Sequence, residues 1–530
     1  MTQIKSVHAG VDVIWLALLS VYIMGGAAIV PFHGDESSKI YIGRDYYYLF
    51  LEGEREKLSQ QAKRSAGPGQ YRANLASGSI SNMIYGWLAA SSGYAITDLN
   101  DDWHWGLDYR ENLESNRVPE ARLLWMARLV SAAQLAAAAA LVYAFARISI
   151  NRPTALLASL FFAAHPTLLL NGRRAMQEGS HLLGIMLALV MAAWLIRERR
   201  WRGYALLGAC AGCAIAAKHS SAFTVAIVFL AIFGLSVYER LPGLRGTKLA
   251  SAFATPSPGP LPRSNGEGEP RSREDDTHSR NRYDAAPAKA IIAPKLRSSL
   301  HCNGGNGGNE GGKTKGEREP ELIGHEPMRR APRPRLDMRP FTGILLAGII
   351  ALLVFYLLNP GWWEAPLATA GEVMSERTEL LQRQAGVYGG YQSLSQQARG
   401  FFRFVLIGEP QYFEDKAWAG YTEISEQIQF YEGSGWAGAT IGGNALAGLV
   451  MSALVAAGMI LLIRDRDISL QNRALLLFWG GGIAAIVFAL TPLPWARYYL
   501  PVLPFTLMMA AYALTRMSGA MRKRRDMARR

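Results

Sequence analysis

Long blocks of apolar residues recur along this 530-residue chain, and they restrict what it can fold into. Each block runs for roughly 15 to 23 residues, and most are long enough to cross about 30 Å of hydrocarbon as a helix. The stretches 135–145 and 344–358 are apolar on every face, whereas a helix of a soluble protein keeps a polar face. The sequence therefore predicts an all-α polytopic membrane protein.

We expect about ten transmembrane helices. The apolar blocks lie at about 11–31, 122–144, 154–171, 179–196, 203–217, 220–238, 341–358, 443–463, 473–491 and 498–515. The first block is too long for the core of a signal peptide and lacks a convincing small-residue cleavage site, which favours a retained anchor.

Arginine and lysine gather in alternate connections between these blocks. The clusters lie at 147–152, 197–202, after 238, at 464–473 and at 522–525. If the N-terminus is cytoplasmic, all of them lie inside, as the positive-inside tendency requires. This orientation predicts cytoplasmic termini at the cell (plasma or inner) membrane and two long outer loops, 32–121 and 359–442. It also explains the net charge of +14 without nucleic-acid binding.

The segment 241–340 differs in composition from its surroundings. It is dense in Pro, Gly, Ser, Asn and charged residues and has almost no aromatic residues, so it buries too little apolar area to offset chain entropy. We expect a disordered cytoplasmic linker, which is either a tolerated insertion or a partner-binding tail. It divides an N-terminal membrane module, 1–240, from a C-terminal one, 341–516, and a basic tail follows at 517–530.

The three cysteines predict neither a disulfide framework nor a metal site. Cys210 and Cys213 lie in a Gly/Ala-rich apolar block without a second ligand pair, which is typical of helix packing, and Cys302 lies in the linker. The run Asp101-Asp102-Trp103-His104 leaves a divalent metal open, although none is indicated.

An acidic pair, Asp35-Glu36, follows the first apolar block. Two carboxylates are poor membrane anchors, so they form either a polar cap at the interface or an acid or base group at the membrane surface. Partial desolvation would raise the pKa of a carboxyl there towards working pH. Lys39 and Arg44 follow closely and are candidate substrate-binding residues.

A second polar group opens the fourth apolar block. Arg174, Glu178 and His181 are spaced by four and then three residues, so they share one face if the helix begins early. Glu178 would also cap the N-terminus of that helix.

Two cations complete the candidates on the expected outer face. Lys218 interrupts a long apolar stretch, and Arg497-Tyr498 lies between Pro494 and Pro501 at the outer end of a span. Each cation either anchors its helix in the headgroups or binds a phosphate, with Tyr498 as a neighbouring substrate contact.

In their order, these motifs resemble those of GT-C fold glycosyltransferases, in the family of dolichyl-phosphate-mannose protein mannosyltransferases and lipid A aminoarabinose transferases. Asp35-Glu36 matches the acidic pair in that family's first outer loop. Arg174 and Glu178, Lys218 and Arg497-Tyr498 match later motifs, and Asn359-Pro360-Gly361-Trp362-Trp363 is similar to the motif that closes the seventh span. Ser77-Gly78-Ser79 stands where many members carry Lys-Pro-Pro or His-Pro-Pro.

The resemblance implies transfer of a hexose or pentose from a polyprenyl phosphate to an acceptor hydroxyl at the outer face, with inversion. Asp35 would be the base, Glu36 its orienting or acceptor-binding neighbour, and Glu178 a supporting or acceptor-side carboxylate. Lys218 and Arg497, with Arg174 third, would bind the donor phosphate. No cofactor is obligatory, and the acceptor is a protein, a lipid or a glycan within the membrane environment.

Three other functions remain open at this point. A lipid-linked oligosaccharide polymerase or ligase also requires outer cations and large outer loops. A secondary transporter would place ionisable residues near mid-membrane and carry repeat symmetry, whereas the polar residues here collect at one face. A purely structural membrane protein is the third.

Overall fold

A computed structural model describes residues 2–65, 77–240, 339–439 and 444–529, and in these residues every regular element is a helix. This confirms the predicted all-α class. The expected linker, 241–340, lies outside the described residues except for its last two positions, with which the helix α16 begins.

Eleven helices account for the ten predicted blocks. They are α1 (Thr2–Gly25), α8 (Ala121–Ser149), α9 (Arg152–Ala164), α10 (Pro166–Arg173), α11 (Glu178–Glu198), α12 (Trp201–Ala217), α13 (Ser221–Tyr238), α16 (Arg339–Leu358), α20 (Ala445–Arg464), α21 (Leu470–Leu490) and α22 (Leu503–Arg529). Within the described ranges, eight helical segments are long and apolar enough to span a membrane, and a bent pair makes nine. The fifth expected block forms helix α12, which has only 17 residues and is not among these spans.

The third expected span is a broken helix rather than a continuous one. Helix α9 ends at Ala164, and α10 begins at Pro166 at an angle of 61°. Proline lacks an N–H group and its ring blocks the preceding turn, but it fits the first position of a new helix. Pro166 therefore redirects the chain towards the end of the bundle where α11 begins.

Both expected outer loops contain helices of their own. The first loop includes α2 (Gly34–Ile42), α3 (Arg44–Tyr46), α4 (Gln60–Ser65), α6 (Ser79–Ser91) and α7 (Tyr109–Glu114). The second includes α17 (Pro366–Tyr388), α18 (Leu394–Phe401), a π-helical turn (Phe402–Ile407) and α19 (Thr422–Gly433). A 3-10 helix, η8 (Ala496–Val502), precedes α22.

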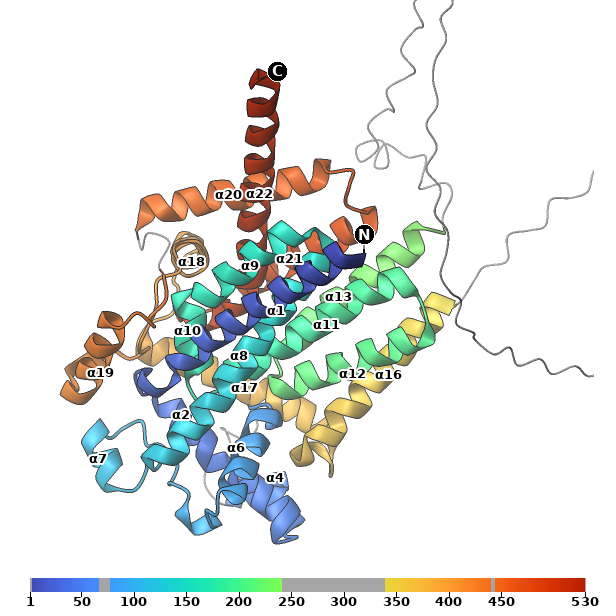
Figure 1. Ribbon diagram of the computed structural model, residues 1–530. Coiled ribbons are helices and arrows are strands. Elements are labelled where there is room, and N and C mark those ends of the chain that lie inside the picture. Colours follow the sequence, from blue (N-terminus) through green and yellow to red (C-terminus); the bar gives the residue numbers. More distant parts are fainter. Residues whose placement is uncertain (1, 66–76, 241–338, 440–443, 530) are drawn as a thin grey trace, which may run out of the picture. The chain divides into compact units, whose positions relative to one another are not determined.

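The N-terminal and C-terminal modules contact each other closely through α12 and α16, which lie side by side (Figure 1). A Cβ atom placed on Gly208 would lie 2.4 Å from the carbonyl oxygen of Ala347. One on Gly212 would lie 2.5 Å from that of Ala351. Small residues one turn apart let two backbones approach in this way. Cys210 and Cys213 are half-buried in the same helix.

The arginine-rich connections lie at one end of the helices. Asp12 of α1 pairs with Arg147 at 2.8 Å and with Arg152 at 2.7 Å. Asn472 at the start of α21 donates to the Ser149 carbonyl, which links a third connection to this end. Both labelled termini also lie here, whereas α4, α6 and α7 lie at the opposite end (Figure 1).

Candidate active site

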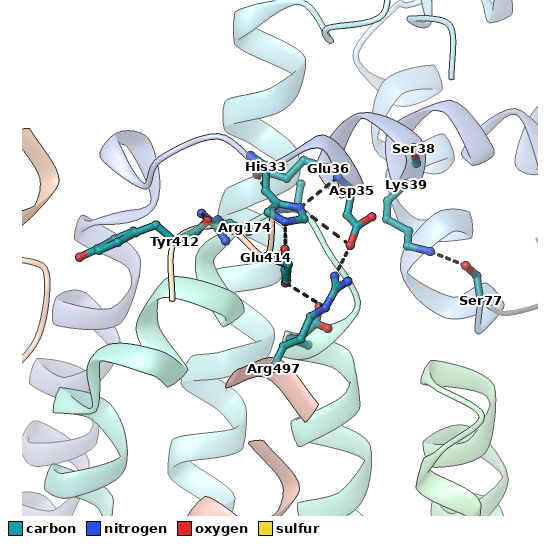
Figure 2. Close-up of polar contacts among 12 residues, drawn as sticks. His33, Asp35, Glu36, Ser38, Lys39, Ser77, Arg174, Tyr412, Glu414 and Arg497 are labelled. Carbon is teal, nitrogen blue, oxygen red and sulfur yellow. Dashed lines mark hydrogen bonds and ion pairs between the residues drawn. The ribbon is translucent and has the colours of Figure 1, made fainter. Parts of the chain in front are cut away.

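The acidic pair lies in the first turn of α2, whose N-terminus is fixed by a capping box. The Asp35 N–H donates to Nδ1 of His33 at 3.1 Å, and the His33 N–H donates to the Glu36 carboxylate at 3.0 Å. These reciprocal hydrogen bonds satisfy amides that a helix N-terminus otherwise leaves unpaired. The Glu36 carboxylate turns back to the His33 amide, whereas the Asp35 carboxylate lies beside Arg497 (Figure 2).

Glu36 is completely enclosed. Arg128 of α8 donates two hydrogen bonds of 2.8 Å to its carboxylate, and the Ala175 N–H donates a third of 2.8 Å. Burial opposes ionisation, but the charge and hydrogen bonds of Arg128 outweigh it and lower the pKa of Glu36. This side chain therefore holds α2 against α8 and against the segment before α11.

Asp35 faces Arg497, a residue 462 positions further along the chain. The Arg497 guanidinium donates a hydrogen bond to the Asp35 carboxylate, whose side chain remains 24% exposed (Figure 2). Burial raises the pKa of Asp35, but Arg497 outweighs burial and holds it well below its usual range. Asp35 is thus an ionised, partly accessible carboxylate.

Glu414 from the second outer loop completes this part of the site. Its Oε1 lies 3.1 Å from Nε of Arg497, and its Oε2 lies 2.6 Å from Nε2 of His33. Because Nδ1 of His33 accepts the Asp35 amide, Nε2 carries the proton that is donated to Glu414. Burial raises the pKa of Glu414, but Arg497 and His33 outweigh burial and lower the pKa to about 2.

A second acid and cation pair lies close by. Lys218, in extended conformation just after α12, donates to Glu178 at the start of α11 over 2.9 Å. Lys39 donates to Ser77 and interacts electrostatically with both Asp35 and Glu178. Burial lowers the pKa of the Lys39 ammonium to about 8, against the attraction of these two acids. The cluster thus contains three acids, Asp35, Glu178 and Glu414, and three cations, Lys39, Lys218 and Arg497.

Arg174, a further candidate, makes its hydrogen bonds to backbone carbonyls. Arg174 is buried and donates to the carbonyls of Pro31 (3.0 Å) and Tyr412 (2.7 Å). It precedes α11, which begins only at Glu178, so it does not share a helical face with Glu178 and His181. The bonds of Arg174 instead tie the second outer loop to the end of the first span.

His181, Tyr498 and Arg44 also have defined surroundings. His181 is buried one turn after Glu178, and neither ring nitrogen has a hydrogen-bond partner within the described part of the chain. Tyr498 stacks on Trp495, and its ring lies 5.8 Å from the Arg497 guanidinium carbon. Arg44 bonds to the Leu99 carbonyl at 2.9 Å, away from the acid and cation cluster.

Sequence reasoning did not identify Glu414 or Arg128 as site residues. Glu414 lies in a run rich in aromatic and acidic residues, and nothing in that run distinguishes it from Asp415. Arg128 lies inside an apolar helix, where a charged residue costs free energy unless it is paired. That cost is the one sequence feature that could have marked Arg128.

No group of three metal-ligating side chains occurs among the residues that the structure describes. In the run that left a metal open, Asp102 accepts from Ser38 at 2.8 Å, and Nδ1 of His104 accepts from the Gly106 amide at 3.3 Å. These two side chains are thus engaged separately.

A family model matches part of the chain. A search of curated proteins found no similar sequence. Residues 102–241 match the model of the dolichyl-phosphate-mannose-protein mannosyltransferase family. The matched region contains Arg128, Arg174, Glu178 and Lys218, whereas Asp35, Glu414 and Arg497 lie outside it. The match confirms the resemblance over this region: the chain carries a domain of the dolichyl-phosphate-mannose-protein mannosyltransferase type, consistent with a GT-C glycosyltransferase.

Proposed function

We propose that this protein is a membrane glycosyltransferase that moves a sugar from a polyprenyl phosphate to an acceptor hydroxyl at the outer face. The family match supports glycosyltransferase activity with such a donor, and mannose is the sugar that the family's name indicates. The observation that carries the proposal is the direct contact between Asp35 and Arg497, because it joins a partly exposed carboxylate to a cation.

The proposed reaction is a single displacement with inversion. The acceptor oxygen forms a bond to the anomeric carbon while the bond from that carbon to the phosphate oxygen breaks, and the electron pair leaves with the phosphate. The hydroxyl proton passes to the Asp35 carboxylate, which acts as general base. Because a phosphate-linked sugar is already activated, the step requires no nucleotide, and we propose no obligatory cofactor.

The cations of the cluster fit the charge that develops on the leaving phosphate. Arg497 and Lys218 are the proposed phosphate ligands, and Lys39 adds a third positive charge beside Asp35 and Glu178. Glu178 holds Lys218, and Glu36 holds α2, so we propose supporting roles for both. Arg174 acts indirectly, through the carbonyls that it binds.

The outer location is supported by the distribution of charge along the molecule. The arginine-rich connections lie at one end of the helices, and the helices of the first long loop lie at the other (Figure 1). By the positive-inside tendency, the arginine-rich end is cytoplasmic.

Asp35→Asn tests the proposed base. In membranes supplied with a polyprenyl-phosphate mannose, we expect transfer to fall by about 100-fold or more, because an amide does not accept the hydroxyl proton. Asp101→Asn is the matched control, since it removes an exposed acid of the same loop outside the cluster. Undiminished transfer by Asp35→Asn would rule out Asp35 as base, and retention of the donor's anomeric configuration would rule out a single displacement.

A further inference from the structure

Arg497 is shared by two carboxylates from different outer loops. Asp35 belongs to the first loop and Glu414 to the second, and each forms an ion pair with the same guanidinium (Figure 2). Trp495 and Tyr498 lie 5.1 Å and 5.8 Å from the guanidinium carbon. Arg497 therefore has a defined position, but its charge is divided between two partners.

The two carboxylates are held very differently. Glu414 is anchored independently of Arg497, because His33 donates to it at 2.6 Å and the His33 ring stacks on Trp418 at 5.5 Å. For the Asp35 carboxylate, Arg497 is the one hydrogen-bonding side chain within the described residues. Asp35 is also the more exposed of the two, at 24% against 13% for Glu414.

This arrangement limits Asp35 as a base. A carboxylate that is paired with a guanidinium is a poor proton acceptor, because protonation would forfeit the ion pair, and the lowered pKa of Asp35 expresses this cost. A base that is to act on a hydroxyl works better when its pKa lies closer to working pH. Asp35 therefore gains basicity when it leaves Arg497.

The donor's phosphate is suited to cause that departure. A sugar polyprenyl phosphate is a phosphodiester with one negative charge, the same as a carboxylate, and a guanidinium binds either group with paired hydrogen bonds. Exchange of one for the other leaves the charge that Arg497 faces unchanged. Glu414 keeps the guanidinium oriented throughout, because its own anchor does not depend on Asp35.

We infer that the donor phosphate displaces Asp35 from Arg497 while Glu414 remains bound, so that donor binding itself releases the base. This inference rests on the proposed function and assigns Glu414 as a positioning residue for Arg497. It implies that donor binds before acceptor, and that without donor Asp35 stays paired and does not activate a hydroxyl or water.

The inference is tested by binding rather than by transfer. The probe is farnesyl phosphate. Farnesol, which lacks the phosphate, measures the contribution of the isoprenoid group to binding. Both are titrated against the purified full-length protein in detergent at pH 5, where a phosphate monoester carries mainly one negative charge, as the phosphodiester of the donor does. Asp35→Asn removes the carboxylate that the phosphate displaces, so we expect about tenfold tighter binding of farnesyl phosphate and unchanged binding of farnesol.

Glu414→Gln is the matched variant, since it makes the same acid-to-amide change on the other partner of Arg497. We expect less than a twofold change in farnesyl phosphate affinity, because Glu414 contacts Arg497 both before and after the exchange. The tighter binding of Asp35→Asn should vanish in the double variant with Arg497→Ala.

Each other result has a distinct meaning. Weaker or unchanged phosphate binding by Asp35→Asn, or tighter binding by Glu414→Gln instead, would overturn the exchange while leaving the phosphate site intact. If the wild-type protein bound farnesol as tightly as farnesyl phosphate, the phosphate site of the proposed function would fail, and the exchange with it. Altered farnesol binding identifies a damaged fold, in which case Asp35→Ser carries the same expectation.

Discussion

At the scale of single residues, adjacent acids in this site have opposite surroundings. Glu36 receives four hydrogen bonds and is fully enclosed, whereas the partly exposed carboxylate of Asp35 accepts a side-chain hydrogen bond from Arg497. The helical turn explains this difference, since consecutive residues point about 100° apart on a helix. The enclosed acid fixes the position of α2, and with it the position of its neighbour.

Lys39 gives the site a pH dependence of predictable sign. Its pKa is about 8, lowered chiefly by burial, so its ammonium is charged below pH 8 and loses its proton as the pH rises through that value. If Lys39 attracts the donor phosphate, the KM for donor should rise by about three- to tenfold between pH 7 and pH 9. Initial rates at varied donor concentration measure this rise.

Lys39→Arg is the informative variant for that prediction. Arginine stays charged over the whole range, so the KM of the Lys39→Arg variant for the donor should be nearly constant between pH 7 and pH 9. The other charged or titratable groups that interact with Lys39 are the same in both proteins: Asp35, Asp102, Glu178, Lys218, His219 and Arg497. An identical rise in both would assign the pH dependence to another group.

The sequence singled out all but one of the acids and cations that the structure brings together in the acid and cation cluster, but not their pairing. Asp35, Glu178, Lys218 and Arg497 were recognisable because each interrupts or ends an apolar block where charge is costly. Glu414 escaped because it lies in a polar loop, where an acid costs nothing and no periodic pattern marks it. Its role depends on contacts with His33 and Arg497, which lie 381 and 83 positions away, and such contacts arise only when the chain is folded.

At the scale of elements, the apolar blocks predicted the membrane helices well because each block is long and nearly uniform. The helices of the outer loops were not predicted. Helix α17 has 23 residues, of which only two are buried, and its polar composition gives no apolar stripe at helical spacing. The break at Pro166 was visible as a proline within a block, but the direction of the bend depends on packing.

The turn at Gly408 is predicted to lock the broken span in place. Gly408 ends the π-helical turn with a φ of +72°, and a Cβ atom there would lie 2.6 Å from Nε2 of His165, between α9 and α10. We expect Gly408→Ala to lower the free energy of unfolding by about 1 kcal/mol for the backbone and about 1–3 kcal/mol more for the clash. Denaturant titration in mixed micelles measures the loss.

Gly53→Ala separates those two contributions. Gly53 has nearly the same φ, +73°, but a Cβ atom there would meet no atom within 4 Å. The free energy of unfolding of the Gly53→Ala variant should therefore fall only by the backbone contribution of about 1 kcal/mol. Equal losses in the two variants would mean that His165 moves aside freely and does not fix the turn.

At the scale of the whole molecule, the site draws on both membrane modules. Asp35 and Glu178 come from the N-terminal module, and Glu414 and Arg497 come from the C-terminal one. The close contact between α12 and α16 joins these modules although 98 residues outside the described ranges separate α13 from α16 in sequence. Within the described residues, the contact between α12 and α16 thus helps to bring together the two parts of the chain that supply the candidate site.

The orientation of the molecule gives the last prediction. Glu114 is exposed on α7 of the first long loop, and Arg466 is exposed in the turn between α20 and α21, at the arginine-rich end. After the three native cysteines are replaced by serine, Glu114→Cys should react with a membrane-impermeant maleimide in intact spheroplasts. Arg466→Cys should react only after permeabilisation, because the reverse orientation would place the 13 arginines and lysines of 147–152, 197–202, 464–473 and 522–525 outside, against the positive-inside tendency. If Arg466→Cys reacted in intact spheroplasts and Glu114→Cys did not, the cluster would lie on the cytoplasmic side. The lipid-linked donor would then have to react there, before it crosses the bilayer.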